Sequence, residues 1–237
     1  MERASLKETS LLVVKLGTGI LTSRSKQIDP AQVEQLVAQV AAQRGAGREV
    51  VVVSSGAVGA GMGALGLAKR PTDLSDLQAC AAVGQSRLMS TYSELFARHN
   101  QPVAQVLLTH DDLEHRDRQL NARNTLVSLL DKGVVPIVNE NDAVSYTELK
   151  FGDNDWLAAL VACLLPADLL VVLTTVDGLV ENFGKKNPRT LPVVETIDAN
   201  IKKLAGGTLS ATAIGGMEAK LRAAATVSYT HLTLPTI

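Results

Sequence analysis

Short aliphatic runs alternate along this chain with longer segments whose apolar residues recur at helical spacing. The run Val50–Val53 is apolar on consecutive residues, which is typical of a strand buried on both faces. After Asp29 and Pro30, two residues common at helix starts, the apolar residues recur on one helical face until Gly45. This alternation predicts an α/β fold, a three-layer α/β/α sandwich around a mostly parallel sheet. The predicted strands are 11–16, 50–53, 102–109, 134–138 and 169–173; further helices are predicted over 73–98, 117–132 and 155–165.

Charge and composition exclude several classes of protein. The 23 basic and 24 acidic side chains give a net charge of −1, which argues against a protein that coats nucleic acid or binds membranes through basic residues. Only 3% of residues are aromatic, too few for base-stacking surfaces. Cys80 and Cys163 form no disulfide framework, and the histidines lack the spacing of zinc ligands. The N-terminal segment does not resemble a signal peptide, so a cytoplasmic protein is expected.

The uncharged segment 50–68 is long enough to resemble a membrane span, but its glycines favour another interpretation. We predict a strand followed by a glycine-rich loop. Residues 61–66 match G-x-G-x-x-G, yet they lie well beyond the strand, whereas a dinucleotide-binding motif opens its helix directly after the strand. The chain also lacks the P-loop motif. Neither common nucleotide-binding motif is therefore present.

Polar residues and glycines follow four of the five predicted strands. The carboxyl ends of parallel strands meet at one edge of a sheet, where ligands bind. We therefore expect these residues to converge on one rim. They are Lys15 and Gly17, residues 54–56, residues 139–142, and Thr174 with Thr175.

Taken singly, the charged residues of this set have ordinary explanations. Lys15 is consistent with a lysine that extends from a sheet end to solvent, and Asp155 with a helix cap. Lys220 is consistent with a surface residue, although in the first turn of a helix it opposes the dipole unless an anion is near. No Ser-His-Asp or Cys-His arrangement and no glycosidase-type carboxylate pair stands out. The sequence thus offers positive charge and amides but no evident general base.

Seven motifs occur in order over residues 11–226. They are VVKLGTGIL (13–21), VVVSSGAVGAG (51–61), AAVGQSRLM (81–89), IVNENDAV (137–144), GDND (152–155), LTTVDGL (173–179) and GGMEAK (215–220). Together they resemble the glutamate-phosphorylating members of the amino acid kinase family. The resemblance implies the fold of that family, which carbamate kinase shares, and transfer of a phosphoryl group from ATP, with Mg²⁺, to the γ-carboxylate of L-glutamate. The product would be L-glutamyl 5-phosphate, the first intermediate of proline biosynthesis.

The resemblance also implies roles for individual residues. The catalytic residues would be Lys15, Lys220 and Asp155, with the aspartate orienting both lysines. Glutamate would bind to Ser55, Gly56, Asp142 and Asn154, and no protein side chain is expected to ligate a metal. Further implied partners are L-proline as a feedback inhibitor and a second copy of the chain in a dimer or tetramer. The nucleotide would contact Gly17, Thr174, Thr175, Asp177, Gly215, Gly216 and Met217.

The sequence departs from the family pattern at three places. Thr175 stands where many relatives have aspartate, and Ala213 and Ile214 replace small or polar residues before the glycine pair. We expect a kinase domain over 1–226 that lacks its last part, with no PUA domain. Residues 227–237 have no family counterpart and resemble one reading frame of a transposon adapter, so we expect a read-through tail. Alternatives are a sibling kinase for another small carboxylate or carbamate, a non-catalytic binding protein, and an inactive truncated fragment.

Overall fold

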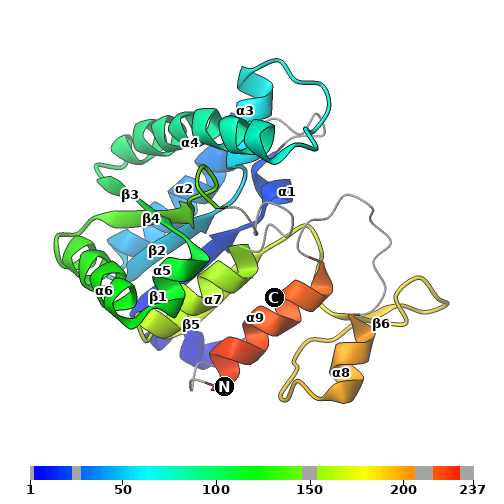
Figure 1. Cartoon of the computed structure of the whole chain (residues 1–237). Helices are drawn as coiled ribbons and strands as arrows, with labels where there is room; N and C mark the ends of the chain where they lie inside the picture. Colours follow the sequence, from blue (N-terminus) through cyan, green and yellow to red (C-terminus); the bar gives the residue numbers. More distant parts are fainter. Residues whose placement is uncertain (1–2, 23–27, 146–153, 206–215, 230–237) are drawn as a thin grey trace.

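The computed structural model describes residues 3–22, 28–145, 154–205 and 216–229. Its centre is a five-stranded sheet in the order β3-β4-β2-β1-β5, and every pairing is parallel (Figure 1). The predicted α/β fold and all five predicted strands are confirmed, with ends shifted by a residue or two. The strands are β1 Leu11–Leu16, β2 Glu49–Ser54, β3 Val103–Leu108, β4 Val135–Glu140 and β5 Leu169–Leu173.

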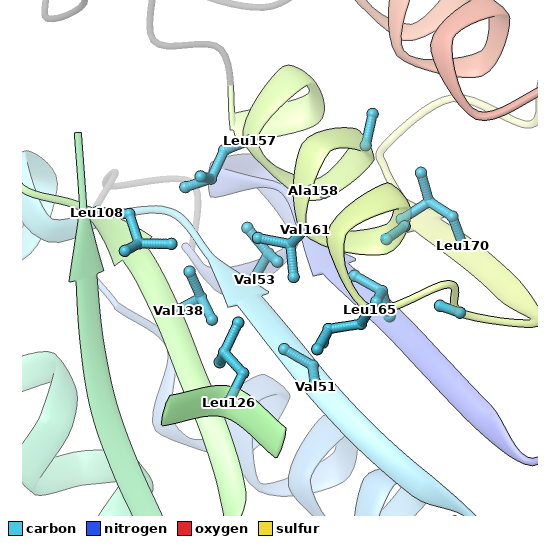
Figure 2. Close-up of a cluster of buried hydrophobic side chains, with 14 of the residues drawn as sticks. Val51, Val53, Leu108, Leu126, Val138, Leu157, Ala158, Val161, Leu165 and Leu170 are labelled. Atoms are coloured by element: carbon cyan, nitrogen blue, oxygen red, sulfur yellow. The ribbon is translucent and has the colours of Figure 1, made fainter. Parts of the chain in front are cut away.

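Three helices cover one face of the sheet: α6 (Arg116–Asp131), α7 (Asn154–Leu164) and α9 (Met217–Tyr229). Figure 2 shows α7 lying across the strands, with Leu157 and Val161 directed toward Val53 of β2 and Val138 of β4. Val51, Val53 and Val138 are at most 1% exposed, so this face is dry. The α7 side of the sheet is therefore a rigid support for the loops at the strand ends.

The opposite face is covered by α2 (Pro30–Gly45) and α4 (Leu74–Ala97). As predicted, Asp29 caps α2, because its carboxylate accepts hydrogen bonds from the amides of residues 31 and 32. Val33, Val37 and Val40 of α2 are buried against alternate residues of β1 and β2. Alternate side chains of β2 thus enter two different cores, which explains its consecutive valines.

The prediction of a glycine-rich loop after β2 is wrong, because residues Ala57–Ala64 form helix α3. The glycines permit close packing of α3 on α4. A Cβ atom on Gly61 would lie 1.8 Å from the carbonyl oxygen of Cys80, and one on Gly84 would lie 1.7 Å from that of Ala57. Glycine is thus required at these two positions by contact between the helices.

We predict that Gly84→Ala destabilises the protein by at least about 2 kcal/mol, because the new methyl group would overlap backbone atoms that cannot move away cheaply. Urea unfolding followed by circular dichroism measures the change. Gly45→Ala is the matched control, since that helical glycine has open space where the Cβ would be and should change stability by less than about 1 kcal/mol. Equal stability of Gly84→Ala and the unsubstituted protein would refute the packing explanation.

The remaining elements lie around this core. The predicted helix 117–132 corresponds to α6. Helix α9 continues through Val227, which is fully buried. It thus extends past residue 226, after which the sequence predicts a tail; residues 230–237 lie outside the described part.

None of the described helices has the length and hydropathy to cross a membrane. The other elements are η1 Arg3–Glu8, α1 Thr18–Leu21, α5 His110–Glu114, β6 Val180–Glu181, β7 Arg189–Thr190 and α8 Ala199–Leu204.

Candidate active site

The carboxyl ends of the strands form one rim, as predicted, and backbone hydrogen bonds connect their loops. The amide of Gly17, after β1, donates to the carbonyl of Leu173 in β5 at 3.2 Å. The amide of Ser55, after β2, donates to the carbonyl of Leu16 at 3.2 Å. The polar residues beyond the ends of β1, β2 and β5 are therefore neighbours in space.

A buried aspartate at this rim holds two lysines. Oδ1 of Asp155 lies 2.6 Å from Nζ of Lys15, and its Oδ2 accepts a hydrogen bond from Nζ of Lys220 at 2.9 Å. The exposed fractions of the side chains are 1% for Asp155, 9% for Lys15 and 18% for Lys220. The structure thus brings together three residues that are far apart in sequence and that the family resemblance predicts to be catalytic.

The fold explains why these three side chains meet. Side chains of a strand alternate between faces, so Lys15 projects to the same side as Val13, toward α7. Asp155 is in the first turn of α7, and Lys220 is in the first turn of α9, which packs on α7. Lys15 is therefore not a lysine that extends into solvent, and Lys220 is not an ordinary surface residue.

The cluster carries an excess of positive charge. Two ammonium groups share one carboxylate, so positive charge exceeds negative charge among these three side chains. The α9 N-terminus adds a partial positive charge next to Lys220. The arrangement is suited to bind an anion and to stabilise negative charge that develops during a reaction.

Asn154 connects this cluster to the turn after β2. Its amide nitrogen lies 2.8 Å from the carbonyl oxygen of Ser54, 2.9 Å from Oγ of Ser55 and 3.0 Å from Oδ1 of Asn139 at the end of β4. The side chain is buried, and its neighbour in sequence is Asp155. Asn154 and Ser55, both predicted as substrate-binding residues, are thus in direct contact.

The hydrogen bonds continue from Asn139 to residues that sequence reasoning missed. Nδ2 of Asn139 donates to Oε1 of Gln85 at 2.8 Å, and Nε2 of Gln85 donates to Oε1 of Gln105 at 3.0 Å. Gln85 is buried in the structure. In the sequence, its amide interrupts an otherwise apolar helix face, and this interruption is the signal that could have identified it. A row of amide side chains therefore runs from the lysine cluster to the edge strand β3.

This row borders a cavity of about 480 Å³, a size typical of small-molecule sites. The cavity lies between α4, the strands β3 and β4, and the loop after β4. That loop brings Asp142, the predicted partner of a substrate ammonium group, into the cavity wall. The lining also includes Ala57, Gln85, Gln105 and Asn141.

The turn between β2 and α3 is held rigidly. Gly56 has φ of +102°, a conformation that side chains disfavour, which explains glycine at this position. The hydroxyl groups of Ser54 and Tyr92 are 2.8 Å apart, and burial raises the pKa of Tyr92 far above its usual range. Tyr92 therefore stays neutral and fixes the turn from the α4 side of the sheet.

The residues predicted to bind a nucleotide occupy the neighbouring loops. The Gly17 backbone lies beside the lysine cluster, since a Cβ there would be 3.7 Å from Nζ of Lys15. A Cβ on Gly19 would approach Cγ2 of Thr175 to 2.8 Å, which places the loops after β1 and β5 in contact. Thr174 is half-buried, whereas Thr175 and Asp177 are exposed. Gly216 precedes α9, Met217 is its first residue, and Lys220 follows three residues later; Gly215 lies outside the described residues.

Comparison with known proteins agrees with this geometry. The model of the amino acid kinase family matches residues 10–231. Glutamate 5-kinase of Geobacter sulfurreducens is 48% identical over 226 residues, and glutamate 5-kinase of Pseudomonas putida strain F1 is 50% identical over 214 residues. These alignments cover 94% and 90% of this chain but only 61% and 58% of the two relatives. The chain thus spans about three-fifths of the length of the curated relatives that it matches.

The fold also matches a solved structure. Carbamate kinase from Giardia lamblia, determined with AMP-PNP bound, superposes with a TM-score of 0.62 over 96% of this chain and 93% of that chain, at 15% identity. The agreement supports the predicted three-layer architecture. The family model, which covers most of the sequence, shows that the chain belongs to the amino acid kinase family.

Proposed function

We propose that this protein transfers the γ-phosphoryl group of ATP to the γ-carboxylate of L-glutamate, giving L-glutamyl 5-phosphate and ADP. Its similarity to the two glutamate 5-kinases supports the choice of substrate. The observation that carries the proposal is the pair of lysines, Lys15 and Lys220, held on the buried Asp155. The product is the activated acid from which proline biosynthesis starts.

The proposed reaction needs positive charge rather than a general base. A carboxylate is ionised at neutral pH, so its oxygen attacks the γ-phosphorus without losing a proton. The new carboxyl O–P bond forms as the bond from the γ-phosphorus to the bridging oxygen breaks, and ADP leaves with that electron pair. Two anions must approach each other, and Lys15 and Lys220 offset their repulsion as charge spreads over the transferring group. Asp155 fixes the orientation of both ammonium groups.

ATP is proposed to bind at the rim between the loops after β1 and β5, where the Gly17 backbone lies beside Lys15. The AMP-PNP complex of the Giardia carbamate kinase supports a nucleotide site in this fold. No cluster of three His, Cys, Asp or Glu side chains suited to a metal occurs in the part of the chain that the structure describes. Mg²⁺ is therefore proposed to bind mainly through the phosphates and water, and it would neutralise phosphate charge.

Glutamate is proposed to lie between the lysine cluster and the cavity, with Ser55, Gly56 and Asn154 at its reacting carboxylate. The amide row through Asn139 and Gln85 connects these residues with the cavity. Asp142 in the cavity wall is the proposed partner of the α-ammonium group. L-proline is proposed as an inhibitor that competes for this site, in a cytoplasmic homo-oligomer.

We predict that Asp142→Ala raises the KM for glutamate at least tenfold and changes the KM for ATP less than twofold. The carboxylate is proposed to contact the α-ammonium group, whose pairing is worth about 1.5–3 kcal/mol in binding. Initial rates over a range of both substrates measure the two constants. Asp111→Ala, which removes a carboxylate from α5, is the control. An unchanged KM for glutamate would remove Asp142 from the substrate site.

The activity itself is tested by ADP release with glutamate, N-acetylglutamate, aspartate or carbamate as the acceptor. The 237-residue chain is compared with a chain extended by the C-terminal part of the Geobacter relative that it does not cover. Glutamate-dependent release by either form supports the proposal. Release with another acceptor alone favours a sibling kinase, and a folded extended chain that is silent with glutamate contradicts the proposal.

A further inference from the structure

Helix α9 is the element that brings Lys220 to the site, and its main packing partner is α7 (Figure 1). Ala223 and Val227 of α9 are 1% and 0% exposed and form a buried line against the α7 side of the core. Two small apolar contacts of this kind fix the distance between helices. They constrain the rotation of α9 about its own axis only weakly.

The side chains on either side of this line do constrain the rotation. At about 100° per residue, Lys220 and Arg222 fall on opposite sides of Ala223. Lys220 reaches Asp155 at 2.9 Å, and the guanidinium carbon of Arg222 lies 5.1 Å from the ring centre of Trp156. The two partners are consecutive residues in the first turn of α7. Each contact therefore opposes rotation of α9 in a different direction.

Trp156 is itself held in place. Its ring centroid lies 6.4 Å from that of His110 at the start of α5, with an angle of 30° between the planes. The Trp156 side chain is half-buried, so its outer face accepts the guanidinium group while the rest contacts protein. Arg222 thus stacks on a ring that has a support of its own rather than on a mobile side chain.

We propose that the stack of Arg222 on Trp156 is a positioning device that sets the rotation of α9 and so holds Lys220 on Asp155. The role of Lys220 in phosphoryl transfer rests on the proposed function; the position of its side chain is a structural property that can be measured without substrate. Arg222 and Trp156 are positioning residues, since neither is in the lysine cluster. Without the stack, α9 rotates more freely and Lys220 spends more time away from the carboxylate.

The first test measures the accessibility of Lys220 directly, by labelling with acetic anhydride and peptide mass spectrometry in the absence of substrates. The ion pair and partial burial shield its nitrogen, so Arg222→Gln should raise the labelling rate of Lys220 about threefold, the effect expected from loss of one exposed cation–π contact. Lys15, which is on β1, should be labelled at an unchanged rate. Arg222→Lys should lie between Arg222→Gln and the unsubstituted chain, and Arg123→Gln, a loss of charge on the exposed side of α6, should have no effect.

A double-mutant cycle assigns the effect to the stack. Trp156→Leu should raise Lys220 labelling as Arg222→Gln does, and the double variant should show no further increase, because both substitutions remove one contact. In active enzyme, Arg222→Gln should lower kcat about threefold with unchanged KM values. Unchanged Lys220 labelling in Arg222→Gln overturns the proposal, as does a parallel increase at Lys15, which would indicate general loosening. Absence of kinase activity in the folded extended chain would contradict the proposed function and would leave the labelling result decisive for this inference.

Discussion

Replacement of Lys220 by alanine is expected to lower kcat by at least about a hundredfold and to change the KM for ATP less than about threefold. The ammonium group at the start of α9 is proposed to stabilise charge that appears mainly as the phosphoryl group leaves ADP. An interaction made chiefly in the transition state affects turnover more than ground-state binding. Removal of a single preorganised donor to developing negative charge typically costs about 10²–10³ in kcat.

Steady-state kinetics with coupled detection of ADP provide the measurement, and nucleotide affinity is measured separately by equilibrium binding. Lys202→Ala is the matched control, because that lysine is exposed on α8 and should leave both constants unchanged. The opposite pattern, a large loss of ATP affinity with unchanged kcat, would assign Lys220 to nucleotide binding and refute its proposed catalytic role.

The sequence predicted the sheet because its signals were local. Consecutive valines at 50–53, the cap at Asp29 and the alternation of runs each report directly on a strand or a helix end. Parallel topology then dictates that strand ends share a rim, so the sequence alone was enough to predict, in outline, that the residues after β1, β2 and β5 lie close together. These predictions needed no knowledge of which helix packs on which.

The errors and omissions concern contacts between elements. A glycine-rich segment after β2 was interpreted as a loop, because sequence periodicity does not reveal that Gly61 and Gly84 face another helix at near backbone contact. The row formed by Asn139, Gln85 and Gln105 was missed for the same reason. Each amide occupies an ordinary position in its own element. The role of each amide becomes clear only from its hydrogen bond to a residue of another element.

Asp155 shows which part of the candidate site could be predicted from local sequence and which part could not. A carboxylate near a helix start is usually a cap, and only the resemblance to amino acid kinases assigned it to the two lysines. The distances of 2.6 Å and 2.9 Å give that assignment a physical basis. We therefore expect this residue to have two separable effects, one on folding and one on catalysis.

Asp155→Asn is expected to lower both stability and activity. The asparagine has the same shape but removes the carboxylate charge that both neighbouring ammonium groups contact, one of them nearly buried. Breaking a buried ion pair on one side typically costs about 3–5 kcal/mol, and partial exposure of Lys220 places this case near the lower value. We expect unfolding in urea to show a loss of about 3 kcal/mol, and kcat to fall at least about a hundredfold.

A second substitution separates these two effects. In Lys15→Met/Asp155→Asn, an apolar side chain of similar length replaces one ammonium group and relieves the repulsion, so most of the lost stability should return. Catalysis should not return, because the cationic pair that is proposed to face the phosphoryl group is gone. Recovery of activity together with stability would show that Asp155 acts only in folding. Loss of activity that persists in a restabilised chain would show that this cluster is needed for phosphoryl transfer itself, apart from its contribution to stability.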